Sequence, residues 1–519
     1  MYVNSIINTR QYIINYIIRL KNRKKSKQEK RGGKIMGNDK YYDILRDKEK
    51  KLYKLSDAIW EFAETNYQET RSAKYFCDAL EEDGFSVERQ YNGIETAFLA
   101  EYGQGKPVLA FLAEYDALPD LGQEADCLLK KRHNENADGH GCSHNALGMG
   151  SYAAALVLKE YLEKTKKEGT VRLYGCPAEE GGFSKAFLVR DGKFDDVDVV
   201  LAWHPDNMNY IAPAALLATI LVHVTFKGKS AHAALEPHLG RSALDAAELM
   251  NVGVNFLREH MSSNARIHYA FLDAGGRYAN VVQEHTKMLY QLRAPKMKEC
   301  RELLERVEKI AQGAAMMTET EVEMEIDTAV ADVLPNYTLE RILHKNFEKI
   351  GMFSIDEEDK AFAEQVRALL SEKDKESDKE RIIALYGSSV SEEIEREMNG
   401  KSIQDTILPY HEPTGLLFGS TDVGDVSQVV PTAQISTAGR AAGTPNHSWM
   451  VTMQGKRPLL KKSAIHAGKI MAAAAIELLE KPEELKEVKK EFIKRTNGEK
   501  YQSILPEACC PYKTKEDVL

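Results

Sequence analysis

The sequence predicts an α/β fold in which a mostly parallel sheet is flanked by helices and carries an inserted ferredoxin-like α+β domain. Three observations support this prediction. Buried strand patterns alternate with helical patterns up to residue 215, as in chains that build parallel sheets. Polar residues gather where these strands end. The middle of the chain then changes to the order β-α-β-β-α-β, which is that of the ferredoxin-like unit.

The elements of the first part follow from hydrophobic periodicity. Apolar positions recur every three or four residues from Tyr41 to Asn92, which predicts helical structure there. A buried strand that runs into a loop is expected over Lys106–Pro119, and a helix over Asn145–Lys164. Two further strands are expected within 169–182 and 197–206, each ending in polar residues. Because the carboxyl ends of parallel strands meet at one edge of a sheet, these polar residues are predicted to lie together.

The middle of the chain has the pattern of the inserted domain. We expect strands at 218–227, 267–272, 286–293 and 321–328, and helices at 242–259 and 297–316. The first pattern then resumes. The predicted boundaries are a main domain in two parts, 36–215 and 331–485, an insert, 216–330, and a C-terminal tail, 486–519. The charge-dense stretch Asp356–Asn399 indicates a solvated helical surface rather than a site.

The first 35 residues are expected to be a non-native extension. Codons for Arg31–Gly33 can encode a ribosome-binding site, so we predict that translation starts at Met36. Arg10 and Arg19 limit the apolar run to less than the length that spans a bilayer. No small-residue cleavage site follows it, which argues against a signal peptide. The alternative interpretation is an amphipathic helix on a membrane surface.

Composition excludes several classes of protein. Hydrophobic residues are 43% and charged residues 29% of the chain, which is enough for a full core and argues against disorder. The net charge of −9 argues against nucleic-acid binding, which needs a basic face. Seven scattered cysteines do not form a disulfide framework and indicate a reducing cytoplasm. We therefore expect a cytoplasmic protein that binds neither nucleic acid nor membranes.

One short segment, "DGHGCSHNALG", places His140, Cys142 and His144 at alternate positions. A thiolate and imidazoles at this spacing in a loop can converge on one metal ion or bridge two. These ligands suit zinc and other late first-row metals. The alternative is a cysteine packed as a small hydrophobic residue beside two solvated histidines. The segment alone does not decide between the two interpretations.

Three other segments favour the metal site. "PAEEGG" places Glu179 and Glu180 in a loop, where one carboxylate can bind metal while the other serves as a general base. "AWHPD" places His204 at a strand end, and "TPNHSW" places His447 in the second part of the main domain. Each segment alone is weak, but all lie at predicted loop ends. Serine-hydrolase, P-loop, dinucleotide-binding and H-E-x-x-H motifs are absent, and a cysteine protease built on Cys142 would leave the glutamate pair unexplained.

The order of eight motifs resembles that of the two-metal aminoacylase and carboxypeptidase family. The motifs are "EYDALP", "GHGCSHNALG", "PAEEGG", "WHPD", "FKGKSAHAA", "ANVV", "STDVGDVS" and "TPNHSW". They cover about Tyr41 to Lys481 and look most like the branch of p-aminobenzoyl-glutamate hydrolases and Xaa-Arg dipeptidases. Two positions depart from the family pattern. Ser143 stands where a glycine is usual, and Cys176 where a small or hydroxyl residue is expected.

The resemblance implies a site for two divalent metal ions, which could be zinc, manganese, cobalt or nickel. The implied ligands are Cys142, His144, Glu180, His204 and His447. Glu179 would be the general base that shuttles the proton. Asp116 would hold a ligand imidazole in the required tautomer, as metal-bound histidines usually need.

The resemblance also implies roles for residues of the insert, which would act as a lid and as a dimerisation domain. His232 would reach across a dimer interface and donate a hydrogen bond to the developing oxyanion. Asn280 and Arg293 would hold a substrate carboxylate, and a guanidinium can bind a carboxylate through two parallel hydrogen bonds.

The implied function is that of an amidohydrolase or dipeptidase that uses a metal-bridged water to cleave an amide next to a free carboxylate. The substrate stays open between p-aminobenzoyl-glutamate, an N-acyl amino acid and a dipeptide. We expect a homodimer, and a hetero-oligomer with a related subunit is the alternative. The chain could then be a partner-dependent or regulatory subunit that is not active alone. A structural metal site without hydrolysis is a third interpretation, against which the free carboxylate of Glu179 argues.

Overall fold

The computed structural model describes most of the chain after its N-terminal segment. It describes residues 39–511 apart from 134–136, 213–214, 388–391, 393–394 and 397. The predicted extension 1–35 and the predicted start at Met36 lie outside the described residues. The chain divides into two compact units between Asp43 and Ile44, and the fold described below is that of the second unit.

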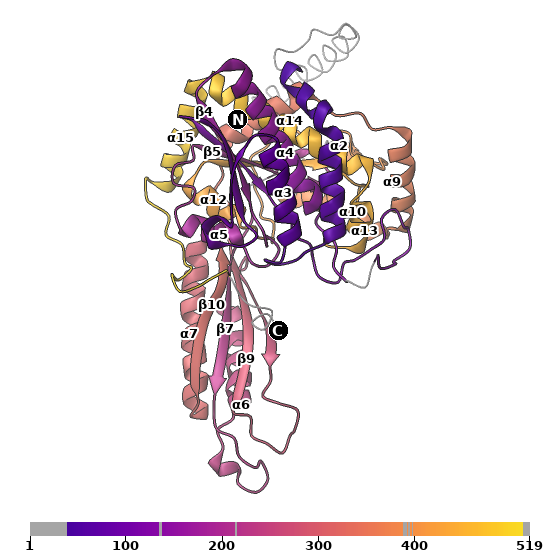
Figure 1. The fold of residues 1–519 in the computed structure, drawn as a ribbon. Helices are drawn as coiled ribbons and strands as arrows, with labels where there is room; N and C mark the ends of the chain where they lie inside the picture. The colour runs from indigo at the N-terminus through magenta and orange to yellow at the C-terminus, as the bar shows by residue number, and fades with distance from the viewer. Residues whose placement is uncertain are drawn as a thin grey trace, which may run out of the picture. The chain divides into compact units, whose positions relative to one another are not determined.

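The main domain is built on a mixed seven-stranded sheet, which confirms the predicted α/β class. Its order is β1-β2-β4-β3-β5-β11-β6. The four neighbouring strands β4, β3, β5 and β11 are parallel, and β2 and β6 join them antiparallel (Figure 1). The strand bounds are β1 (Ser86–Arg89), β2 (Phe98–Gln104), β3 (Val108–Ala113), β4 (Gly169–Gly175), β5 (Val199–Asp206), β6 (Tyr210–Ala212) and β11 (Thr432–Ala438).

Helices cover this sheet (Figure 1). Helices α4 and α14 contact each other and β3, β4, β5 or β11, while α5 contacts α12. Glycines permit the close approach of α4 and α14, because a Cβ at Gly468 would lie 2.7 Å from the carbonyl oxygen of Gly150. The helix bounds are α2 (Asp39–Phe62), α3 (Thr70–Glu82), α4 (His144–Thr165), α5 (Ser184–Arg190), α8 (Tyr337–Ile350), α9 (Glu357–Leu369), α10 (Glu372–Tyr386), α12 (Val423–Val429), α13 (Trp449–Gln454), α14 (Pro458–Glu480) and α15 (Pro482–Thr496).

One predicted element is wrong in part. The helical prediction from Tyr41 extended to Asn92, but α3 ends at Glu82 and β1 follows. Gly84 has φ +80°, a left-handed conformation that glycine adopts readily and that ends the helix. Strand β1 is a mostly exposed edge strand, so its sequence lacks the alternation that marks a half-buried strand.

The insert has the predicted element order. Its four-stranded antiparallel sheet has the order β10-β7-β9-β8, and both of its helices pack on it (Figure 1). Buried and half-buried side chains alternate along β9, so the helices cover one face of this sheet. The bounds are β7 (Ala218–Lys227), α6 (Ala243–Leu257), β8 (Arg266–Asp273), β9 (His285–Ala294), α7 (Met297–Thr318) and β10 (Glu321–Val330).

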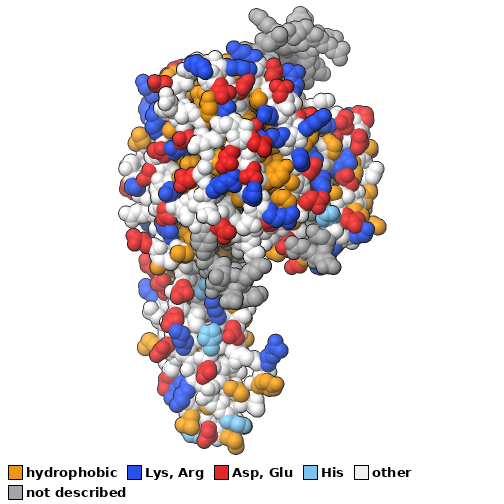
Figure 2. Space-filling view, viewed as in Figure 1, with side chains coloured by type: hydrophobic (Ala, Val, Ile, Leu, Met, Phe, Trp, Pro, Cys, Tyr) orange, Lys and Arg blue, Asp and Glu red, His pale blue; other side chains and the backbone are white. Residues whose placement is uncertain are grey.

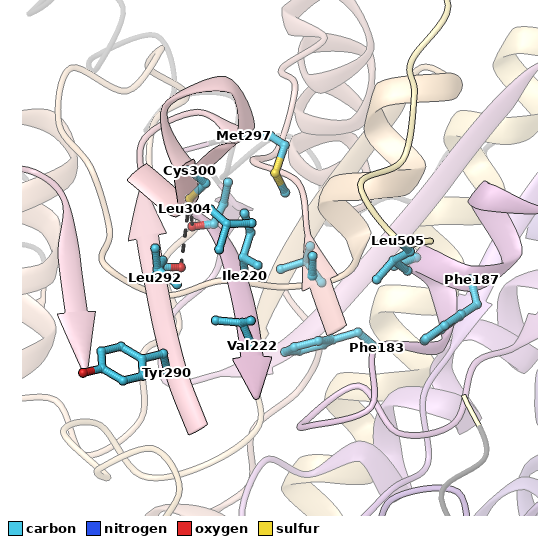
Figure 3. Close-up of a cluster of buried hydrophobic side chains, with 14 of the residues drawn as sticks. Phe183, Phe187, Ile220, Val222, Tyr290, Leu292, Met297, Cys300, Leu304 and Leu505 are labelled. Atoms are coloured by element: carbon cyan, nitrogen blue, oxygen red, sulfur yellow. Dashed lines mark hydrogen bonds between the residues drawn. The ribbon is translucent and has the colours of Figure 1, made fainter. Parts of the chain in front are cut away.

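A shared hydrophobic cluster joins the insert to the main domain (Figure 3). Ile220 of β7 and Leu304 of α7 belong to the same cluster as Phe187 of α5. The chain beyond α15 packs here too, since Leu505 is only 5% exposed. The thiol of Cys509 donates to the carbonyl oxygens of Ile326 and Asp327 on β10. The predicted boundary of the tail at residue 486 thus falls inside α15, and the domain boundaries stay a prediction.

No helix within the described part of the chain is both long and apolar enough to cross a bilayer. Positive and negative side chains are interspersed on the face seen in Figure 2.

The parallel strands of the main sheet define the place of the site. Strands β3, β4, β5 and β11 are parallel neighbours, so they end at the same edge of the sheet.

Candidate metal centre

The segment "HGCSH" lies immediately before α4, which begins at His144. Ser143 has φ +65°, a left-handed conformation, which explains why a glycine suits this position. His140 has a different environment from the other two side chains. It is buried, and its Nε2 lies 2.9 Å from the carbonyl oxygen of Ile59. The structure therefore gives His140 a structural hydrogen bond.

The strand ends bring distant residues to Cys142. Its Sγ lies 3.3 Å from Nε2 of His204, near the end of β5. Glu180, in the loop after β4, lies with Oε2 3.4 Å from Nε2 of His447. The backbone N–H of His447 donates to the carbonyl oxygen of Gly141, which anchors that loop beside Cys142. Five residues from four segments of the chain thus surround one space.

Two groups of potential metal ligands share Cys142. One consists of Cys142, His144 and His204, and the other of Cys142, Glu180 and His447. Within each group the ligand atoms all lie within 4.8 Å of one another. A thiolate common to two groups has the geometry of a ligand that bridges two metal ions.

Hydrogen bonds orient the imidazoles of His144 and His204 toward this space. Nδ1 of His144 lies 2.8 Å from Oδ1 of Asp116, and Nδ1 of His204 lies 2.8 Å from the carbonyl oxygen of Pro205. Both partners are acceptors, so each Nδ1 carries a proton, and Nε2 of the neutral His204 presents a lone pair. Burial lowers the pKa of His144, but Asp116 and Cys142 outweigh it and raise that pKa well above its usual value, so Nε2 of His144 must lose its proton to bind metal. Asp116 also accepts a hydrogen bond from the N–H of Glu180 and so links two candidate ligands. This is the usual arrangement around metal-bound histidines.

Two buried atoms facing the centre lack hydrogen-bond partners within the described chain. They are Nε2 of His144 and Oε1 of Glu180, which lie 3.9 Å apart. Unpaired buried polar atoms are rare because they lose their hydration without compensation. A metal cation bound at each of these atoms would satisfy it, so the residues present fit a metal centre.

Without a metal ion, the thiol of Cys142 keeps its proton at neutral pH. Burial, together with the carboxylate of Glu180, raises the pKa of Cys142 to about 12. Burial, together with His144, lowers the pKa of His204 to about 4, which keeps this imidazole neutral and able to bind metal. A divalent cation would reverse the preference of the thiol, since a coordinated thiol is deprotonated.

Glu179 sits beside the two groups. Thr421 donates a hydrogen bond of 2.8 Å to Oε1 of Glu179. Burial and the nearby carboxylates of Glu114, Glu180 and Asp422 raise the pKa of Glu179 well above its usual value. A carboxyl with a raised pKa can both accept and return a proton near neutral pH. A third possible ligand group consists of Glu114, His144 and Glu179. By geometry alone, Glu179 could therefore also serve as a metal ligand.

A buried ion-pair network, which the sequence did not reveal, lies behind this carboxylate. Nζ of Lys185 lies 2.6 Å from Oδ1 of Asp422 and 2.8 Å from Oε1 of Glu114. Lys185 and Asp422 are both 0% exposed. Glu114 in turn lies 3.5 Å from Nε2 of His144. The motif "STDVGD" contains Asp422, but nothing in the sequence indicates its lysine partner, 237 residues away.

Replacing Lys185 with Met should destabilise the protein strongly. The change leaves the carboxylates of Glu114 and Asp422 buried without their cation, and breaking a buried pair costs about 3–5 kcal/mol. Chemical denaturation measures this. The matched control is Lys74→Met, which removes an exposed pair with Asp78 and should cost at most about 1 kcal/mol. An equal loss of unfolding free energy in both variants would mean that the buried ion pairs of Lys185 do not stabilise the fold.

The candidate residues of the insert divide into two locations. His232 and Asn280 lie together, because the N–H of Ala233 donates to the carbonyl oxygen of Asn280. Both are exposed, and among the described residues no hydrogen bond or ion pair links either to the metal-ligand groups. Arg293 lies at the end of β9, where Nη1 donates to Oγ of Ser420 at 3.1 Å. Ser420 precedes Thr421, so this part of the insert is connected to the loop that contacts Glu179.

Comparison with known proteins shows the family of the chain. The model of the peptidase family M20/M25/M40 matches residues 110–450. A p-aminobenzoyl-glutamate hydrolase subunit of Escherichia coli (strain K12) is 41% identical over 482 residues, which are 91% of this chain and 98% of that protein. The Xaa-Arg dipeptidase of Mus musculus is 30% identical over 463 residues, which are 85% and 89% of the two chains.

The fold is also that of a solved structure. The Bacillus subtilis YXEP protein, a dinuclear metal-binding peptidase of the M20 family, superposes with a TM-score of 0.53 at 16% identity. The match covers 83% of this chain and 98% of that one. The chain is a hydrolase of peptide or amide bonds that belongs to the peptidase family M20/M25/M40.

Proposed function

We propose that the protein is a two-metal amidohydrolase that cleaves an amide bond next to a free carboxylate. One observation carries the proposal, namely that Cys142 belongs to two groups of ligand atoms at once. The orphaned Nε2 of His144 and Oε1 of Glu180 support it, since both atoms face those groups. The proposed ligands are Cys142, His144, Glu180, His204 and His447.

The proposed metals are zinc, manganese, cobalt or nickel, and the thiolate and imidazole ligands favour this class over magnesium or calcium. When bound, such ions lower the pKa of water and polarise a carbonyl oxygen. All seven cysteines are free thiols in the structure. A reducing compartment keeps thiols in this state, so we propose a cytoplasmic location.

Glu179 is the proposed general base. Thr421 occupies Oε1, so Oε2 is the oxygen available to take a proton from the attacking water. The raised pKa of Glu179 then allows the protonated carboxyl to pass that proton to the leaving amine nitrogen. Asp116 holds the tautomer of His144 in which Nε2 is free to bind metal.

His232 is the proposed donor to the oxyanion. Its Nδ1 accepts hydrogen bonds from the N–H groups of Ala234 and Leu235, at 3.2 and 3.1 Å. Since Nδ1 is the acceptor, the ring proton resides on Nε2, which is the donor atom. Because His232 makes no bond to the metal-ligand groups of its own described chain, we propose that it serves a partner's site.

The proposed homodimer would form through the insert. Strand β8 is the edge of its sheet, and edge strands readily pair with another chain. Residues 268–273 of this strand are all exposed, including Tyr269, Phe271 and Leu272. On α6, Phe256 is 71% exposed. Hydrophobic side chains are visible on the lower part of the surface in Figure 2, where the insert lies. Exposed apolar side chains beside an unpaired edge favour a protein interface.

Replacing His232 with Ala should lower kcat by about 10²- to 10³-fold, as the loss of one oxyanion donor does. The melting temperature should stay close to that of the wild type, because the side chain is exposed. Mixing this variant with Glu179→Gln should restore about one quarter of wild-type activity, since half of the random dimers contain one complete site. The absence of any rescue would contradict action across the dimer.

The proposed substrates are small molecules with a free carboxylate. Asn280 and Arg293 are the proposed carboxylate-binding residues, and a guanidinium can bind both carboxylate oxygens. The names of the relatives suggest p-aminobenzoyl-glutamate or a dipeptide with a basic residue. An N-acyl amino acid offers the same amide beside a carboxylate.

A hydrolysis screen of the purified protein tests the proposal. The panel contains p-aminobenzoyl-glutamate, β-alanyl-lysine and acetylated amino acids, each with and without a chelator and added Zn²⁺ or Mn²⁺. We expect chelator-sensitive release of the amine from at least one of them. Cleavage that needs a co-purified related subunit would instead support the partner-dependent interpretation, and metal-independent cleavage would overturn the proposed mechanism.

A further inference from the structure

Arg440 is a buried cation for which the proposed chemistry has no role. It lies just after β11, and its side chain is only 2% exposed. Among the described residues no carboxylate lies within ion-pair distance of its guanidinium, and its Nε and Nη1 have no hydrogen-bond partner. Asp206, the neighbouring acid on β5, is engaged instead by two hydrogen bonds from Arg381. Burying a charge this way is costly, so an arginine here needs an explanation.

The partners that Arg440 does have lie next to two proposed metal ligands. Its Nη2 donates to the carbonyl oxygen of Pro205, at 3.2 Å, and to Oδ1 of Asn446, at 2.8 Å. Pro205 follows His204 in the sequence, and Asn446 precedes His447. One guanidinium nitrogen therefore joins the end of β5 to the loop before α13, which lie about 240 residues apart in the sequence, and no other described side chain bonds to both.

The bond to Pro205 acts directly on His204. The same carbonyl oxygen accepts from Nδ1 of His204 at 2.8 Å, and one carbonyl oxygen can accept two hydrogen bonds. Arg440 thus fixes the position of the acceptor that sets the tautomer and the ring orientation of His204. A charged donor in a buried setting makes this bond stronger than one between neutral groups.

The bond to Asn446 acts on the backbone at His447. His447 has φ +50°, a left-handed conformation that is uncommon for residues other than glycine. Such a conformation persists only where its surroundings hold it. Two bonds hold this one, from Nη2 of Arg440 to Asn446 and from the N–H of His447 to Gly141.

We propose that Arg440 is a positioning residue that holds His204 and His447 at the spacing required by the two metal ions. The proposal rests on the proposed two-metal function. It differs from a role in binding substrate, because the bonds of Arg440 go to the residues next to His204 and His447. Removing it should loosen one ligand in each of the two groups that share Cys142.

The test measures the affinity of the purified full-length protein for Zn²⁺ by competition with a chromogenic chelator. Loss of such supporting bonds usually weakens metal binding or activity by about 10- to 100-fold. We expect Arg440→Leu to weaken both Zn²⁺ sites by that factor. Arg440→Lys should restore little of the affinity, because the ammonium of the shorter lysine side chain does not reach the position of Nη2. Asn446→Ala should weaken only one of the two sites.

The matched control is Arg381→Met, which removes a half-buried cation of α10 that pairs with Asp206 at the end of β5 and does not bond to Pro205 or Asn446. It should leave Zn²⁺ affinity within about threefold of wild type, well short of the expected 10-fold effect. Should Arg440→Leu fail to fold, Asn446→Ala and Arg440→Lys still decide the question. Unchanged Zn²⁺ affinity in Arg440→Leu with a raised KM would overturn the proposal and make Arg440 a substrate contact. A wild-type protein that binds no Zn²⁺ would instead overturn the proposed function itself.

Discussion

Replacing Glu179 with Gln is expected to lower kcat by about 10²- to 10⁴-fold while the protein still binds two metal ions. The amide keeps an oxygen that can accept the hydrogen bond from Thr421, so the loop should keep its shape. What the variant loses is the group that takes the proton from water. Steady-state kinetics and elemental analysis of the same preparation measure the two quantities together.

The neighbouring glutamate is the matched control for this prediction. Glu180→Gln should lose metal, because Glu180 belongs with Cys142 and His447 in one ligand group. Loss of metal in Glu179→Gln, with two ions retained in Glu180→Gln, would mean that the two glutamates have exchanged roles. That outcome would favour the third group, in which Glu179 stands with Glu114 and His144.

Replacing Cys142 with Ala should have the largest effect on metal content. Cys142 is common to the two proposed ligand groups, so its loss removes a ligand from both proposed ions. We expect both ions to be lost on gel filtration and kcat to fall at least as far as in Glu179→Gln. His447→Ala, which removes a ligand from one group only, should retain about one ion per chain.

The number of ions left in Cys142→Ala decides between interpretations. Two retained ions would show that the thiol is not a bridging ligand. One retained ion would place a metal at Glu114, His144 and Glu179, which is the remaining group without a cysteine.

The wild-type thiol can also be tested by alkylation. Burial raises the pKa of Cys142 to about 12, so this thiol, when no metal is bound, should react slowly with alkylating agents at neutral pH.

Much of the fold could be predicted because local patterns determine it. The six elements of the insert were predicted within two residues at each end, since each strand and helix has an apolar period that only one conformation satisfies. Strands β1 and β2 were missed. Strand β1 is exposed, and its pairing with β2 depends on contacts that no local pattern shows.

Local patterns likewise predicted some residues of the candidate site and missed others. Cys142, Glu180 and His447 lie in short motifs whose chemistry is visible in the sequence. Lys185 and Arg440 are not visible there, because their functions depend on partners 237 and 235 residues away. A lysine or arginine in a sequence is normally a surface charge, and only packing shows that these two are buried.

The most direct test of the two-metal centre is elemental analysis of the purified protein after removal of loosely bound metal. We expect two divalent ions per chain in the wild type. We also expect a chelator to remove them together with the hydrolytic activity. A protein that cleaves its substrate with no bound metal, or that binds none when Zn²⁺ and Mn²⁺ are supplied, would contradict the two-metal centre around Cys142.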